Sequence, residues 1–166
     1  MRRLLPVAML TTLSACSLQP LYSGSTAGPV ATLMAGIDVA PIEGKGGWLV
    51  ANALRDRLHA VGEGPARYRL TVKLDDRIVG LGVRADDAVS RERRTLRARY
   101  QLLDTTQGTV LLDATAASDA GIDVVGSEYA TIAAESSALE RLSDMVADQI
   151  VARVALYARR SDRKST

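Results

Sequence analysis

The stretch RTLRARYQLLD, residues 94–104, decides the fold. Its apolar residues Leu96, Ala98, Tyr100 and Leu102 alternate with Thr95, Arg97, Arg99 and Gln101. Successive side chains of a β-strand point to opposite faces, so this period of two predicts a strand with one apolar and one polar face. The same alternation at residues 67–74 (RYRLTVKL) and at residues 110–116 (VLLDATA) predicts two further strands.

Reversals of the chain separate these strands. The segment GLGVRADD, residues 80–87, is typical of the tip of a long hairpin, and DTTQG, residues 104–108, predicts a second turn. A polar stretch at residues 119–127 predicts a loop after the third strand. We therefore expect an antiparallel meander. Leu81 and Val83 at the hairpin tip fit either a wedge for a membrane or partner, or a locally packed loop.

Two segments, residues 47–60 and 129–159, carry apolar residues at spacings of three and four, which predicts two amphipathic helices. We expect Trp48 to be a core anchor. His59 falls off the apolar stripe, so we expect it to be solvated. The predicted stripes are Val50 or Ala51, Leu54, Leu58 and Val61 in the first helix, and Ile132, Leu139, Leu142, Met145 or Val146, Ile150, Val154 and Tyr157 in the second.

A short strand at residues 36–41 precedes the first helix, and Pro41 favours a place at the sheet edge, where this strand can run parallel to its neighbour. The glycines of GKGG, residues 44–47, are expected to break the chain. The order is strand, helix, three strands, helix. It predicts an α+β fold: a two-layer sandwich in which two helices cover one face of a four-stranded mixed sheet.

The N-terminus reads as a secretory signal, with Arg2 and Arg3 followed by a short apolar run. LSAC, residues 13–16, resembles the bacterial lipoprotein box, which implies cleavage after residue 15 and a lipid on Cys16. The alternative is a free buried thiol. Ser17, where Asp would signal inner-membrane retention, favours the outer membrane. We expect a signal peptide at 1–15, a lipidated N-terminus and flexible tether at 16–32, one α+β domain at 33–160 and a disordered tail at 161–166.

Composition excludes several classes of function. Cleavage leaves 166 − 15 = 151 residues and lowers Lys+Arg from 21 to 19, equal to the 19 Asp+Glu, so whole-molecule charge gives no argument for nucleic acid. The single cysteine is used by the lipid, which leaves none for a disulfide. One histidine without a nucleophile motif provides no catalytic or metal site. We expect neither an enzyme nor any cofactor besides the covalent lipid.

The polar face of the predicted sheet is rich in cations and poor in equivalent acids. Like charges across strands repel, so such a face favours an anionic partner, and arginine suits phosphates. The alternative is a solvated face whose Lys and Arg protect an edge. Asp75 and Asp113 would neutralise it in part. The candidate binding residues are Arg67, Arg69, Lys73, Arg91, Arg93, Arg97 and Arg99.

Several segments resemble one family. CSLQPLY, residues 16–22, resembles the Cys-Gly-Phe-x-Pro-Leu-Tyr start of mature LptE lipoproteins, from which Ser17 and Leu18 depart. NALRDRL at 52–58, the Ser90-Arg91 pair, ARYQLLD at 98–104 and the long final helix are similar to the α-proteobacterial branch. The resemblance implies the same fold, two helices on a four-stranded sheet.

The resemblance also implies a function. Members of this family are outer-membrane lipoproteins that plug and help assemble the LptD β-barrel and assist lipopolysaccharide delivery to the outer leaflet. The partners expected are therefore LptD, lipopolysaccharide and, through the anchor, outer-membrane lipid. The basic face would contact either lipopolysaccharide or acids of the barrel. Two other readings stay open: an auxiliary lipoprotein of a periplasmic lipid-transport ATPase, and, more weakly, a periplasmic hydrolase using His59.

Overall fold

The structure is a computed structural model that describes residues 28–83, 89–124 and 126–165. Cys16, the signal segment and residues 84–88 of the hairpin tip lie outside the described residues. The elements in chain order are α1 (Pro29–Ala35), β1 (Ile37–Val39), α2 (Gly44–His59), β2 (Tyr68–Val83), β3 (Val89–Asp104), β4 (Thr109–Asp123) and α3 (Glu128–Ser165).

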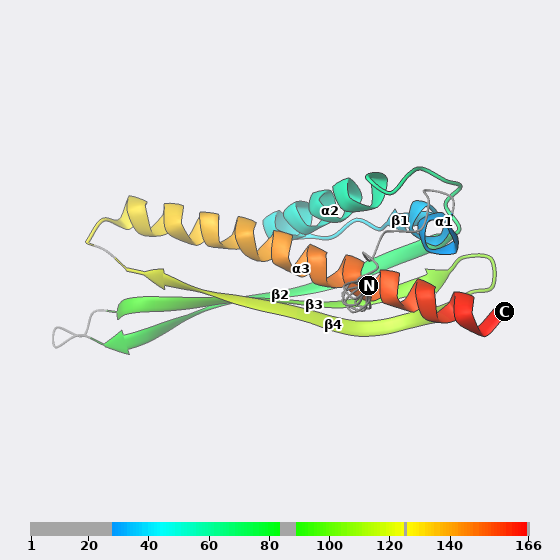
Figure 1. Ribbon diagram of the computed structural model, residues 1–166. Coiled ribbons are helices and arrows are strands. Elements are labelled where there is room, and N and C mark those ends of the chain that lie inside the picture. Colours follow the sequence, from blue (N-terminus) through cyan, green and yellow to red (C-terminus); the bar gives the residue numbers. More distant parts are fainter. Residues whose placement is uncertain (1–27, 84–88, 125, 166) are drawn as a thin grey trace, which may run out of the picture.

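One mixed sheet with the order β1-β2-β3-β4 forms the first layer, and α2 and α3 form the second (Figure 1). The pair β1–β2 is parallel, and the pairs β2–β3 and β3–β4 are antiparallel. The molecule is elongated: α1 and the C-terminal end of α3 lie at one end, and the β2–β3 hairpin reaches the other. The predicted α+β sandwich is confirmed, with α1 as an additional helix.

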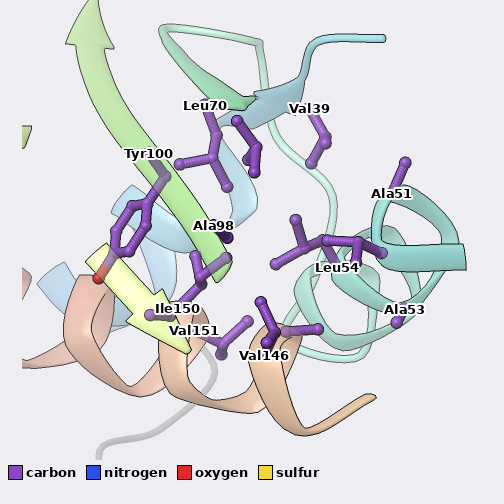
Figure 2. Close-up of a cluster of buried hydrophobic side chains, with 14 of the residues drawn as sticks. Val39, Ala51, Ala53, Leu54, Leu70, Ala98, Tyr100, Val146, Ile150 and Val151 are labelled. Atoms are coloured by element: carbon purple, nitrogen blue, oxygen red, sulfur yellow. The ribbon is translucent and has the colours of Figure 1, made fainter. Parts of the chain in front are cut away.

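The core lies between the helices and the apolar face of the sheet. Leu54 of α2, Tyr100 of β3 and Ile150 of α3 are each at most 2% exposed. Figure 2 shows them in one cluster with Ala98 and Val146. The alternating apolar residues of β3 thus pack directly beneath the helical stripes, as the sequence pattern predicts.

The glycine-rich segment 44–47 is the first turn of α2, so the predicted chain break is wrong. Its glycines are used for close packing. A Cβ on Gly47 would lie 2.6 Å from the main-chain oxygen of Ile42, and one on Gly46 would lie 3.4 Å from a methyl group of Leu139. Glycine therefore lets α2 begin against the preceding chain and α3.

The expected burial of Trp48 is also wrong, because its side chain is 63% exposed. The buried stripe of α2 is formed by Val50, Leu54 and Leu58. Residue 48 precedes this stripe by two positions, about 200° around the helix. Ile132, placed on the stripe of α3, is 54% exposed as well, whereas His59 is exposed as predicted.

The structure differs from the predicted boundaries at both ends of the domain. Residues 29–32, assigned to the tether, belong to α1, which Pro29 begins and whose Met34 is fully buried. Residues 161–165, assigned to a disordered tail, continue α3, which no Gly or Pro interrupts.

All three strands of the meander are longer than predicted, and β3 begins at Val89 rather than at residue 94. Residues 80–83 of the expected hairpin tip belong to β2, and β4 runs to Asp123, through the first part of the expected loop at 119–127. In β4 the period of two continues, with exposed Asp119 and Asp123 on the face away from the helices and buried Ile122 on the other. The end of this strand was predicted as a loop because it is rich in polar residues and contains glycine.

Candidate functional site

The sheet face that the helices leave open is the candidate site, and we call it the open face. The strand register places Lys73 opposite Arg99 and pairs Arg91 and Arg93 with residues of β4. Arg67 directly precedes β2. The alternation therefore brings six of the seven predicted cations to one face, whereas the guanidinium of Arg67 lies over the ring of Tyr68, 5.4 Å from its centroid, and pairs with Asp104. Arg77, which the sequence analysis missed although it continues the same alternation, joins them.

Acids neutralise most of this charge, so the expected shortage of acids is wrong. Ion pairs connect neighbouring strands across the open face, with N–O distances of 3.7 Å for Arg69–Asp38, 3.0 Å for Arg91–Asp123, 4.0 Å for Arg93–Asp119 and 3.0 Å for Arg99–Asp113. Arg77 pairs with Asp75 within β2 at 2.9 Å. Asp119 and Asp123 escaped the sequence analysis because their segment was read as a loop.

Asp113 shows how closely these charges are matched. Its carboxylate accepts two hydrogen bonds from Arg99, at 3.0 and 3.3 Å, and one from the amide of Gln101 at 2.8 Å. The hydrogen bonds from Arg99 and Gln101 hold the pKa of Asp113 below its ordinary value, and the same contact raises the pKa of Arg99. Arg99 is thus already committed to a carboxylate.

Asp104, the last residue of β3, is in phase with the buried helix-facing residues of that strand, and its side chain is only 4% exposed. Burial on its own raises the pKa of Asp104, but hydrogen bonds from the main-chain N–H groups of Thr106 and Gln107 and from Arg67 outweigh it, so the pKa is lowered. Asp104 therefore fixes the β3–β4 turn, and Arg67 has a structural role beside it.

Lys73 and Arg97 are the two predicted cations that have no ion pair or hydrogen bond among the described residues. Both are exposed: Lys73 lies opposite Arg99, and Arg97 lies opposite Asp75, whose carboxylate is bound by Arg77. Lys73 and Arg97 are therefore diagonal neighbours on adjacent strands, which lie within reach of long side chains. The open face thus has a net positive spot at its centre.

A shallow pocket of about 380 Å³ lies on the open face towards the hairpin end. It is lined by Leu81, Arg91, Arg93, Asp119, Gly121 and Asp123. Because its two arginines pair with its two aspartates, the pocket presents mixed charge and suits a zwitterionic or mixed polar surface better than an isolated phosphate.

The helix-facing side of the sheet carries one ion pair that the sequence analysis missed. Arg94, 12% exposed, donates two hydrogen bonds to Asp76, at 2.9 and 2.6 Å, and one to the main-chain oxygen of Glu135 in α3 at 2.8 Å. The hydrogen bond to Asp76 raises the pKa of Arg94. The sequence could have indicated this ion pair, because Arg94 alternates in the same phase as the apolar residues of β3.

His59 lies on the surface, with its Nδ1 3.7 Å from a carboxylate oxygen of Glu63. The described ranges contain no cluster of His, Cys, Asp and Glu able to hold a metal ion. No helix within those ranges is both long and apolar enough to cross a membrane.

The family model for lipopolysaccharide-assembly LptE proteins matches residues 34–154. The chain belongs to the LptE family. The LptE match runs from the end of α1 through most of α3, so it includes the whole sheet. LptE proteins are non-enzymatic outer-membrane lipoproteins of lipopolysaccharide assembly, and the predicted family is confirmed.

Three of the solved structures similar to this chain are described as lipoproteins. One from Caulobacter crescentus is 26% identical, with a TM-score of 0.66 over 79% of this chain and 98% of that one. A minor lipoprotein of Acinetobacter baumannii is 17% identical, with a TM-score of 0.60 over 74% and 92%. Lipoprotein B of Nitrosomonas europaea is 14% identical, with a TM-score of 0.59 over 78% and 88%; the last two likenesses show the fold alone. No curated protein matches the chain by sequence.

Proposed function

We propose that this LptE-family chain is the lipid-anchored plug of an LptD-type outer-membrane β-barrel, which it helps to assemble and through which it assists lipopolysaccharide delivery to the outer leaflet. The observation that carries the proposal is the family match over residues 34–154. The open face, which no element of the described residues covers, provides the surface for a surrounding partner. The plug acts by non-covalent contact.

Lipidation of Cys16 supplies the anchor in this proposal. Two or more acyl chains hold a protein stably on a bilayer, whereas one chain does so only marginally. Residues 17–28 then connect the anchor to α1. Intact mass measurement of the protein extracted from membranes should show the added acyl mass, and Cys16→Ser should lack it and leave the membrane fraction. An unmodified Cys16 in a membrane-bound protein would remove the anchor from the proposal.

A detergent pull-down of the native chain tests the plug role. A C-terminally tagged protein should retain a large outer-membrane β-barrel in equimolar amount after extensive washing. Retention of a transport ATPase and its periplasmic components, with no barrel, would instead support the auxiliary lipoprotein.

The positive spot of Lys73 and Arg97 is the proposed point of contact with anions, either phosphates of lipopolysaccharide or acids of the barrel. Each cation near an anionic lipid surface contributes about 1 kcal/mol, so reversing both charges should weaken lipopolysaccharide binding by tenfold or more at low salt. The variant is Lys73→Glu with Arg97→Glu. Added salt should reduce the difference from the unmodified chain, because it screens exposed charges.

A matched control separates local contact from net charge. Arg141 and Arg160 are exposed on α3, away from the open face, and Arg141→Glu with Arg160→Glu changes the net charge equally. This control should bind lipopolysaccharide nearly as well as the unmodified chain. Equal losses in both variants would exclude the open face, and normal lipopolysaccharide binding with loss of the barrel in the pull-down would assign the spot to the barrel.

A further inference from the structure

The outer edge of β2 is left unpaired over most of its length. β1 pairs only with residues 68–70, although β2 continues to Val83 (Figure 1). The Tyr68 N–H donates to the Gly36 oxygen at 2.9 Å and the Ala40 N–H donates to the Leu70 oxygen at 3.0 Å, so even-numbered residues direct their main chain to this edge. Main-chain direction alternates along a strand. Residues 72, 74, 76, 78 and 80 therefore present N–H and C=O groups that no strand of the described residues binds.

The opposite edge of the sheet is protected. Gln149 of α3 donates its amide N–H to the Ala117 oxygen at 3.2 Å and accepts the Ala117 N–H through its side-chain oxygen at 3.3 Å. A side chain thus occupies the central main-chain positions of β4, where another strand would bind. Proteins commonly block edges in such ways to prevent strand addition. The contrast singles out β2 as the edge available for pairing.

The free stretch of β2 is complementary to itself. Antiparallel pairing of residues 72–80 with the same residues of a second copy places the two-fold axis at Asp76. Asp75 then faces Arg77 of the second copy, and half-buried Leu74 faces Ile78, which is 41% exposed. Opposite charges and apolar residues facing each other across strands both stabilise pairing. The two Asp76 side chains are each already bound to Arg94 within their own chain.

We propose that, in the state not bound to a barrel, two copies of this chain associate through the outer edges of β2, forming one continuous eight-stranded sheet with the two-fold axis at Asp76. This dimer is distinct from the proposed plug, which is a single copy that leaves the dimer when it enters a barrel. The register follows from the limits of the free stretch, because β1 blocks pairing at residue 70 and below. The occupant is a second copy because this short stretch supplies both the oppositely charged pair, Asp75 and Arg77, and the apolar pair, Leu74 and Ile78.

Disulfide cross-linking tests the register. Residues 75 and 77 face each other at non-hydrogen-bonded positions, where Cα atoms lie about 4.5 Å apart, within the range for a disulfide. The full-length chain with Cys16→Ser, which removes the native thiol, carries either Asp75→Cys or Arg77→Cys. Pairing brings the two thiols to about millimolar effective concentration, so an oxidised mixture should give roughly tenfold more covalent dimer than either variant alone.

The matched control uses the protected edge. Thr115→Cys and Ala117→Cys have the same spacing on the same face of β4, and their mixture should give only collisional dimer. Sedimentation of the Cys16→Ser chain should show a concentration-dependent dimer, independent of any cysteine. A monomer at all concentrations, equal cross-linking in mixture and single variants, or equal cross-linking at β4 would each overturn the proposal.

Discussion

Replacing Arg94 by methionine should destabilise the protein by about 2 kcal/mol, because a mostly buried guanidinium bridges two strands and a helix. Methionine keeps the apolar part of the side chain and removes the charge. The change breaks two hydrogen bonds to Asp76 and one to the Glu135 oxygen. Breaking a fully buried pair costs about 3–5 kcal/mol and an exposed one about 0–1 kcal/mol. Arg94 at 12% and Asp76 at 31% exposure lie between these limits.

Urea unfolding followed by circular dichroism measures this change, and a double-mutant cycle isolates the pair. Asp76→Leu combined with Arg94→Met removes both charges, so the double variant should recover most of the lost stability. Arg77→Met is the matched control, because the Arg77–Asp75 pair lies 73% and 48% exposed, and its midpoint should hardly move. A coupling energy below about 0.5 kcal/mol would refute the reasoning, since that is the value of a surface pair.

Three further changes have defined outcomes. Leu142→Ala should lower the free energy of unfolding by about 3 kcal/mol, since the side chain is fully buried. A decrease of only about 0.5 kcal/mol in thermal unfolding, as for a surface residue, would contradict this prediction. Because folding lowers the pKa of Asp104, its ionised carboxylate stabilises the folded protein at pH values above the ordinary pKa of 3.8. This stabilisation is lost as the pH falls through the lower pKa of the folded state. Asp104→Asn should therefore be less stable at neutral pH, and its difference from the unmodified chain should shrink towards about pH 2. Gln149→Ala frees Ala117 of β4, so light scattering should detect more association in this variant than in the unmodified chain.

The fold could be predicted because its strands and helices carry regular apolar periods. The alternation of residues 94–104 and the stripe through Leu142 and Ile150 correspond directly to buried faces. The first turn of α2 could not be predicted, since the need for Gly47 arises from the oxygen of Ile42, a tertiary contact. The predicted burial of Trp48 was wrong because it was based on the size and hydrophobicity of the side chain. The position of Trp48 around the helix places it away from the buried stripe.

The cations of the candidate site could be predicted from the sequence, but the acids that neutralise them could not. The period of two was enough to place six of the seven cations on one face, and it failed for Arg67 at the strand end. Their acidic partners come from β1, β4 and the last residue of β3, at positions fixed only by strand register. Once these partners are known, Lys73 and Arg97 stand out from residues that looked equivalent in the sequence.

The matching lengths of β2 and α3 have a consequence for how far this molecule reaches. A strand of 16 residues measures about 53 Å, and a helix of 38 residues about 57 Å. A bilayer with its headgroups is about 40–45 Å thick. A rod of this length, standing upright with α1 near the inner surface, would bring its hairpin end level with the far surface without any segment entering hydrocarbon.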